Sequence, residues 1–159
     1  ALRLDDLRAG RKKYLYLAKD GSWRSGATWR DARIIVENGA TELSVHYVEA
    51  KKSWMLVQNE PVFPAARIVA RFAARLQGPW SAPQVIFDMP EMQTTDPQRA
   101  ADTFCYAVKA HRGIGEPEKQ LVITYACNAF AFDKLVENMS IYRPRVVTCS
   151  LPDLVCRAL

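Results

Sequence analysis

A series of short, continuous apolar runs constrains the fold of this chain more than any other feature. Each run ends at residues that favour turns, such as Gly, Pro, Asn or Asp, and each is interpreted as a strand. Apolar and polar residues do not alternate strictly within the runs, so the strands are predicted to be covered on both faces, as in a mostly parallel sheet. The predicted strands are 13–18, 41–48, 53–57, 84–88, 120–126 and 145–149.

Segments with helical spacing separate these runs. In residues 64–76 the apolar side chains form one stripe, and Arg67, Arg71 and Arg75 lie on the opposite side of the predicted helix. Strands that alternate with helices predict an α/β fold with layers of helices on a mostly parallel sheet. The predicted helices are 28–36, 64–76, 97–110, 132–139 and 151–159.

Residues 78–83 form the best internal boundary, because this segment contains two prolines and one glycine. The order of predicted elements starts again after it. We therefore expect a lead-in over 1–12, a first repeat over 13–82 and a second repeat over 83–159.

Positive charge is concentrated near the N-terminus. Residues 1–33 hold nine Lys or Arg against four Asp, which accounts for the net charge of +5. A basic face of this kind favours an anionic partner, because binding to phosphates releases counterions. The predicted nucleic-acid contacts are Arg8, Arg11, Lys12 and Lys13, and the alternative is that this segment is only a solvated face. No apolar run is long enough to span a membrane, so no membrane partner is expected.

The four cysteines lie in the second half of the chain, and no two have the spacing of a zinc or redox motif. They are expected to be buried, reduced thiols of a cytosolic or nuclear protein. His46 alternates with apolar neighbours and is expected on the solvent face of a strand. Neither a metal site nor a small-molecule cofactor is predicted.

Several local motifs have counterparts in one known family. Ser25-Gly26 precedes a predicted helix, and Asn38-Gly39 follows it. Residues 53–57 correspond to that family's third strand, and residues 145–155 to its final strand and helix. Together with the order of elements, these motifs resemble the BRCT family. The resemblance implies two BRCT-like repeats, each with a small parallel sheet flanked by helices.

The same resemblance implies a non-enzymatic module that binds a phosphorylated protein or peptide. A phosphate site of this type combines a hydroxyl group, a free backbone N–H and a cation. Ser25 and Gly26 would supply the first two, with Ser22 as a competing hydroxyl, and Arg67 or Arg71 would supply the cation. The implied setting is a nuclear scaffold of chromosomes, DNA repair or the kinetochore, with DNA as a possible second partner.

Two other interpretations remain open. Four aromatic residues near short strands could form a methyl-lysine cage, as in a Tudor-like barrel: Trp23, Trp29, Tyr47 and Trp54. Three aspartates could form part of a metal-dependent nuclease site of the PIN or NYN type: Asp88, Asp96 and Asp102.

Overall fold

The structure is a computed structural model that describes residues 4–10, 14–26, 28–93, 102–116, 119–151 and 153–159. The chain divides into two compact units, Ala1–Glu37 and Asn38–Leu159. The N-terminal unit contains helix α1 (Leu4–Arg8) and an antiparallel pair of strands, β1 (Leu15–Leu17) and β2 (Trp23–Ser25). No helix among the described residues is both long and apolar enough to cross a membrane.

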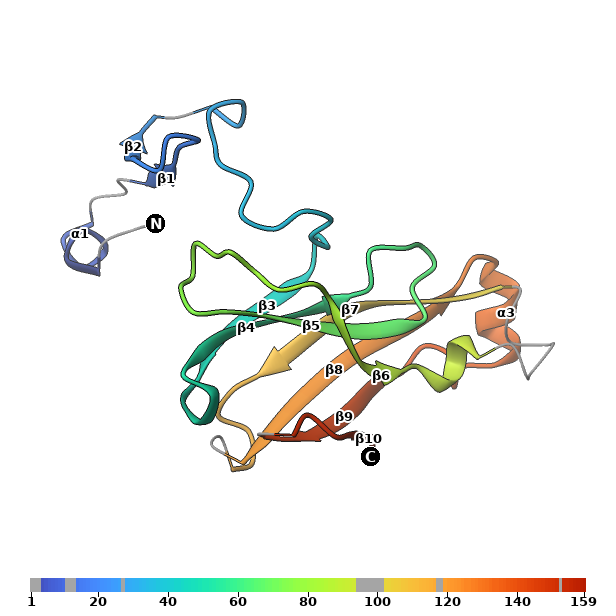
Figure 1. Cartoon of the computed structure of the whole chain (residues 1–159). Helices are drawn as coiled ribbons and strands as arrows, with labels where there is room; N and C mark the ends of the chain where they lie inside the picture. Colours follow the sequence, from blue (N-terminus) through green and yellow to red (C-terminus); the bar gives the residue numbers. More distant parts are fainter. Residues whose placement is uncertain (1–3, 11–13, 27, 94–101, 117–118, 152) are drawn as a thin grey trace. The chain divides into compact units, whose positions relative to one another are not determined.

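The second unit consists mainly of two four-stranded antiparallel sheets (Figure 1). In each sheet the strands follow one another in sequence order. The first sheet contains β3 (Leu43–Val48), β4 (Ser53–Asn59), β5 (Arg67–Ala73) and β6 (Gln84–Asp88). The second contains β7 (Thr103–His111), β8 (Gln120–Ala129), β9 (Pro144–Ser150) and β10 (Cys156–Ala158). The short helices in the described part of this unit are η1 (Glu49–Lys51), η2 (Pro90–Met92) and α3 (Phe132–Glu137).

The hydrophobic core lies between the two sheets. Val57 and Ile68 of the first sheet, and Ile123 and Val147 of the second, are completely buried in one cluster. Burying a side chain of this size stabilises the fold by roughly 1.5–3 kcal/mol. The facing sides of the two sheets therefore form the core of this unit.

Side chains of the first sheet also bind the backbone of strand β7, which forms an edge of the second sheet. Ser44 Oγ accepts a hydrogen bond from the Ala110 N–H at 2.9 Å, and His46 Nε2 donates to the Ala110 carbonyl, also at 2.9 Å. Asn59 Nδ2 donates to the Cys105 carbonyl at 3.2 Å. His46 is therefore directed at the other sheet, and its predicted place on a solvent face is wrong.

The α/β prediction and the resemblance to BRCT repeats are both wrong, because the sheets are antiparallel and few helices are present. Residues 67–73 form strand β5 where a helix was predicted over 64–76, and residues 156–158 form β10 where the last helix was predicted. The segment 78–83 connects β5 to β6, which are paired neighbours in one sheet.

Other predicted elements are present. Strand β6 spans 84–88 as predicted, while β8 and β9 contain the runs 120–126 and 145–149. Helix α3 occupies most of the predicted helix 132–139. The pattern of apolar residues within each segment therefore identified many strands. It did not indicate whether helices or a second sheet cover them.

Two disulfides correct the expectation of reduced cysteines. Cys105 and Cys127 are directly opposite each other on β7 and β8, and they are bonded. Cys149 and Cys156 are bonded in the same way across β9 and β10. Each disulfide therefore links two adjacent strands of the second sheet.

Candidate ligand-binding groove

A groove of about 570 Å³ lies where strands β3 and β7 begin and strand β4 ends. Residues 38–42 form one side, and the segment from Asn59 to Phe63 after β4 forms another. Residues 104–106, at the start of β7, complete it. The groove thus lies at one end of the two sheets, where loops supply most of the side chains.

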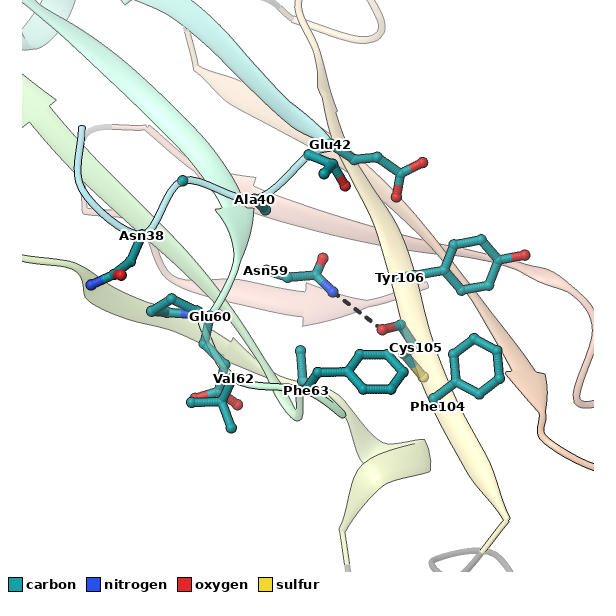
Figure 2. A pocket seen from close by; sticks show the side chains of 14 residues that line it. Asn38, Ala40, Glu42, Asn59, Glu60, Val62, Phe63, Phe104, Cys105 and Tyr106 are labelled. Atoms are coloured by element: carbon teal, nitrogen blue, oxygen red, sulfur yellow. Dashed lines mark hydrogen bonds between the residues drawn. The ribbon is translucent and has the colours of Figure 1, made fainter. Parts of the chain in front are cut away.

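Aromatic rings gather at one part of this groove (Figure 2). The ring of Phe63 lies 5.8 Å from that of Phe104, between centroids, and Phe130 lies 4.7 Å from Phe104. The ring centroid of Tyr106 is also close to that of Phe104, at 5.6 Å. Although it takes part in this cluster, Phe63 remains 67% exposed. An exposed ring at the wall of a groove gives a ligand an apolar surface to contact.

Polar groups line the rest of the groove. Glu42 is half-buried, and it makes no hydrogen bond or ion pair with the residues that the structure describes. The side-chain amide of Asn59 donates a hydrogen bond to the Cys105 carbonyl, while its Oδ1 has no hydrogen-bond partner in the described part of the chain. Figure 2 shows Glu42 and the Phe63 ring at separate parts of the groove. The site therefore combines an apolar wall with a carboxylate and an amide.

Glu60, the second carboxylate of the groove, has a structural role. One of its oxygens accepts a hydrogen bond from the Ala66 N–H at 2.8 Å, and the other pairs with Arg67 Nη2 at 2.7 Å. Burial alone would raise the pKa of Glu60, but the hydrogen bonds from Arg67 and Ala66 outweigh burial, so the pKa is lowered. Glu60 therefore stays ionised and holds the loop between β4 and β5.

Because the pKa of folded Glu60 is below its ordinary value of 4.5, ionised Glu60 should stabilise the fold above about pH 4.5. This contribution should be lost as the pH falls through the lowered pKa. We expect Glu60→Gln to reduce the free energy of unfolding by about 1.5–3 kcal/mol at pH 7. The difference in free energy of unfolding between Glu60→Gln and wild type, measured by urea titration, should be smaller at roughly pH 3.

Glu42→Gln is the matched control, since it removes a carboxylate from the same groove without breaking an ion pair among the described residues. It should change stability by less than about 0.5 kcal/mol. A Glu60→Gln deficit of equal size at pH 7 and roughly pH 3 would contradict the role of the ionised carboxylate.

Comparisons with known proteins give one informative result. No family model and no curated protein matches the chain. Among solved structures, the chain matches a "putative hydrolase" from Bacteroides ovatus ATCC 8483 with a TM-score of 0.65 and 14% identity. The match covers 88% of this chain and 36% of that protein, so this chain spans about a third of its length. The match shows the fold alone.

The residues predicted to bind phosphate are divided between the two units. Ser22, Ser25 and Gly26 belong to the N-terminal unit, where the Ser22 hydroxyl donates to Asp20 Oδ1 at 2.7 Å. Arg67 and Arg71 lie on strand β5, not on a helix. Arg67 pairs with Glu60, and Arg71 donates to the Ser81 carbonyl at 3.0 Å. A shared phosphate site therefore stays a prediction.

The nucleic-acid contacts and the methyl-lysine cage also remain hypotheses. Arg8 lies in helix α1, while Arg11, Lys12 and Lys13 lie outside the described residues. Of the four residues of the predicted methyl-lysine cage, Trp23 and Trp29 belong to one unit and Tyr47 and Trp54 to the other. Tyr47 and Trp54 form an edge-on pair across β3 and β4 with centroids 5.4 Å apart.

For the alternative nuclease site, Asp96 lies outside the described residues, so the three aspartates cannot be compared. In the described residues, the atoms that come close enough together to hold a metal belong to Glu91, Cys105 and Cys127. The two sulfurs form a disulfide, and Glu91 is bound to Arg145 at 2.9 Å and to the Tyr125 hydroxyl at 2.8 Å. These groups form a structural network and not a metal site.

Proposed function

We propose that the chain is a non-catalytic recognition module that binds a neutral carbohydrate chain in the groove. The observation that carries this proposal is one open groove that holds the exposed Phe63 ring and, at another part, a carboxylate and an amide. A sugar ring has an apolar face of C–H groups and a rim of hydroxyl groups. The apolar face fits the phenyl ring, while the hydroxyls can donate to Glu42 and bind Asn59 or the backbone.

The charges of the groove favour a neutral ligand over a phosphorylated one. Glu42 and Glu60 are its charged lining residues among those described, and both are acidic. Phosphate carries nearly two negative charges, so the carboxylates would repel it. A phosphorylated partner, and weak DNA binding by the basic N-terminal segment, would have to use other surfaces of the chain.

A hydrolase is the second candidate, and only the description of the matched structure favours it. Glycoside hydrolysis commonly requires two carboxyl groups, one of which acts as a proton donor. Glu60 is a poor donor because its pKa is lowered and both its oxygens accept hydrogen bonds. Glu42 would therefore need a second carboxyl group from outside the described groove.

The disulfides favour an oxidising compartment for this module. Disulfides persist outside the cytosol and nucleus, whereas intracellular thiols are usually kept reduced. Cys105, Cys127 and Cys149 are completely buried. The nuclear location depended on the resemblance to BRCT repeats, which the fold does not support. We therefore expect the chain to mature in the periplasm or outside the cell.

Replacing Phe63 by alanine should weaken binding to a neutral polysaccharide about tenfold, because one aromatic contact contributes about 1–1.5 kcal/mol. Affinity electrophoresis in gels containing xylan, mannan or β-glucan measures this change, and a gel with anionic pectate tests the charge preference. We expect retardation in at least one neutral gel and less retardation in pectate.

Phe132→Ala is the matched control, because Phe132 is 78% exposed but does not line the groove. It should bind like wild type. Equal weakening by both variants, or no retardation by any of the neutral polysaccharides, would contradict the proposed binding site.

A further inference from the structure

A second pocket, with a volume of about 390 Å³, lies on the second sheet. Strands β8, β9 and β10 line it, together with the segments that precede β8 and β10, and its described lining includes no residue of the groove. Gln120 lies directly opposite Ser150 across β8 and β9, and Thr148 lies directly opposite Arg157 across β9 and β10. Residues opposite each other in an antiparallel pair project to the same side of the sheet. Strand register therefore brings four polar side chains together in this pocket.

The pocket is on the face of the sheet away from the core. Val147 and Cys149 on β9 belong to the core, and side chains alternate between the two faces along a strand. Thr148 and Ser150 therefore project to the opposite face, and their partners on the neighbouring strands project there with them. The same polar side chains thus form the wall of the pocket.

These four side chains have hydrogen-bonding groups that the described protein does not use. None of them makes a hydrogen bond or an ion pair with another described residue. Thr148 is the most informative of the four, because only 5% of it is exposed and it lines the pocket. Nearly buried polar groups in proteins are usually hydrogen-bonded. The Thr148 hydroxyl is therefore a group that a molecule in the pocket can bind.

The charges of this pocket differ in sign from those of the groove. Arg157 is exposed and forms no ion pair with another described residue. Lys119 also lines the pocket, where its ammonium group pairs with Glu116 at 2.7 Å. Two cations and one carboxylate leave a net charge of +1 on the described lining, and Arg157 supplies it. Guanidinium, hydroxyl and amide groups can all donate hydrogen bonds to an anion.

We propose that this pocket binds the sulfate or phosphate group of a small molecule. Such a group has several acceptor oxygens, which point in different directions. The donors of the pocket come from three strands, and the planar guanidinium of Arg157 can bind two of the oxygens at once. A planar carboxylate would use Arg157 but leave most of the other donors unpaired. The inference concerns a separate pocket and does not rest on carbohydrate binding in the groove.

Backbone-amide NMR spectra of the isotope-labelled full chain measure this binding. Sodium sulfate or sodium phosphate, added at constant ionic strength, should shift the amide signals of Thr148, Ser150 and Arg157, with a dissociation constant on the order of 1 mM. The anion that binds more tightly shows whether the natural ligand is a sulfate ester or a phosphate ester. Sodium acetate should shift these signals much less, and glucose should leave them unchanged.

Arg157→Gln should weaken the binding of the anion about tenfold or more, because it removes a charge-assisted hydrogen bond. Arg143→Gln is the matched control, since Arg143 is also exposed but does not line the pocket. It should bind the anion like wild type. Thr148→Val should weaken binding about threefold to tenfold. It should not lower the free energy of unfolding, because the hydroxyl has no partner among the described residues to lose.

The proposal would be overturned if neither sulfate nor phosphate shifted these signals at about ten times the expected dissociation constant. Equal shifts with acetate would also overturn it. Equal weakening by Arg157→Gln and Arg143→Gln would show nonspecific attraction to surface cations, and binding that Thr148→Val leaves unchanged would place the anion outside the pocket. If the Thr148 variant does not fold, Ser150→Ala replaces it, because Ser150 is exposed and lines the same pocket.

Discussion

Replacing Cys105 and Cys127 together by alanine should lower the free energy of unfolding by about 3–5 kcal/mol. The disulfide connects residues separated by 22 positions, and closing a loop of this length stabilises a fold by about 3 kcal/mol. Both cysteines are completely buried, so the smaller alanines also remove packing contacts from the core. Urea denaturation followed by circular dichroism measures the loss, since most strands belong to the second unit.

The pair Cys149 and Cys156 provides the internal comparison. Their separation is only 7 residues, which predicts a contribution of about 2.5 kcal/mol. Removing this pair should therefore be less damaging than removing the first. Alkylation of unreduced, denatured wild-type protein should label no cysteine. Free thiols at these positions, or a Cys105/Cys127 variant as stable as wild type, would contradict the two-disulfide structure.

A second large effect is expected for Glu91→Ala, which should cost about 3–5 kcal/mol of stability. Glu91 accepts a 2.8 Å hydrogen bond from the Tyr125 hydroxyl and forms an ion pair with Arg145 at 2.9 Å. Burial and the hydrogen bond to Glu91 raise the pKa of Tyr125, so it remains a donor. Alanine would leave the mostly buried Arg145 charge without this partner.

The double variant Glu91→Leu with Arg145→Met tests whether the unpaired charge causes this loss. It removes both charges and replaces them with apolar groups, so much of the stability should return. In a double-mutant cycle measured by urea unfolding, the coupling energy should exceed about 1.5 kcal/mol. Additive losses would show that the two side chains act independently.

Strand positions could be predicted from this sequence better than sheet direction. The runs at 84–88, 120–126 and 145–149 are strands, and their apolar residues do occur on both faces. Helices on a parallel sheet and further sheets on an antiparallel one produce the same local pattern. The choice between them depends on which strands pair, and no single segment contains that information.

Strand β7 shows why a helix was predicted where a strand forms. Its pairing with β8 shifts between Tyr106 and Lys109, and Ala107 has a positive φ of 57°. This bulge moves the core positions from Cys105 to Val108, a spacing of three that resembles one turn of a helix. The irregular strand therefore imitates helical periodicity.

The groove could not be predicted from the sequence, because its residues come from three separate segments. Glu42, Asn59 and Phe63 meet residues 104–106 only when the two sheets pack. The disulfides left a clearer signal. An even number of cysteines suggests pairing, although their partners depend on strand register.

The hydrogen bonds between the two sheets have a consequence for aggregation. A nine-residue edge strand such as β7 is a template on which other molecules can add strands. Here Ser44 accepts a hydrogen bond from the Ala110 N–H, and His46 donates one to the Ala110 carbonyl. Asn59 donates one to the Cys105 carbonyl. At these two positions an incoming strand would have to displace bonds that already exist. The side chains that join the sheets thereby also protect the protein against edge-to-edge polymerisation.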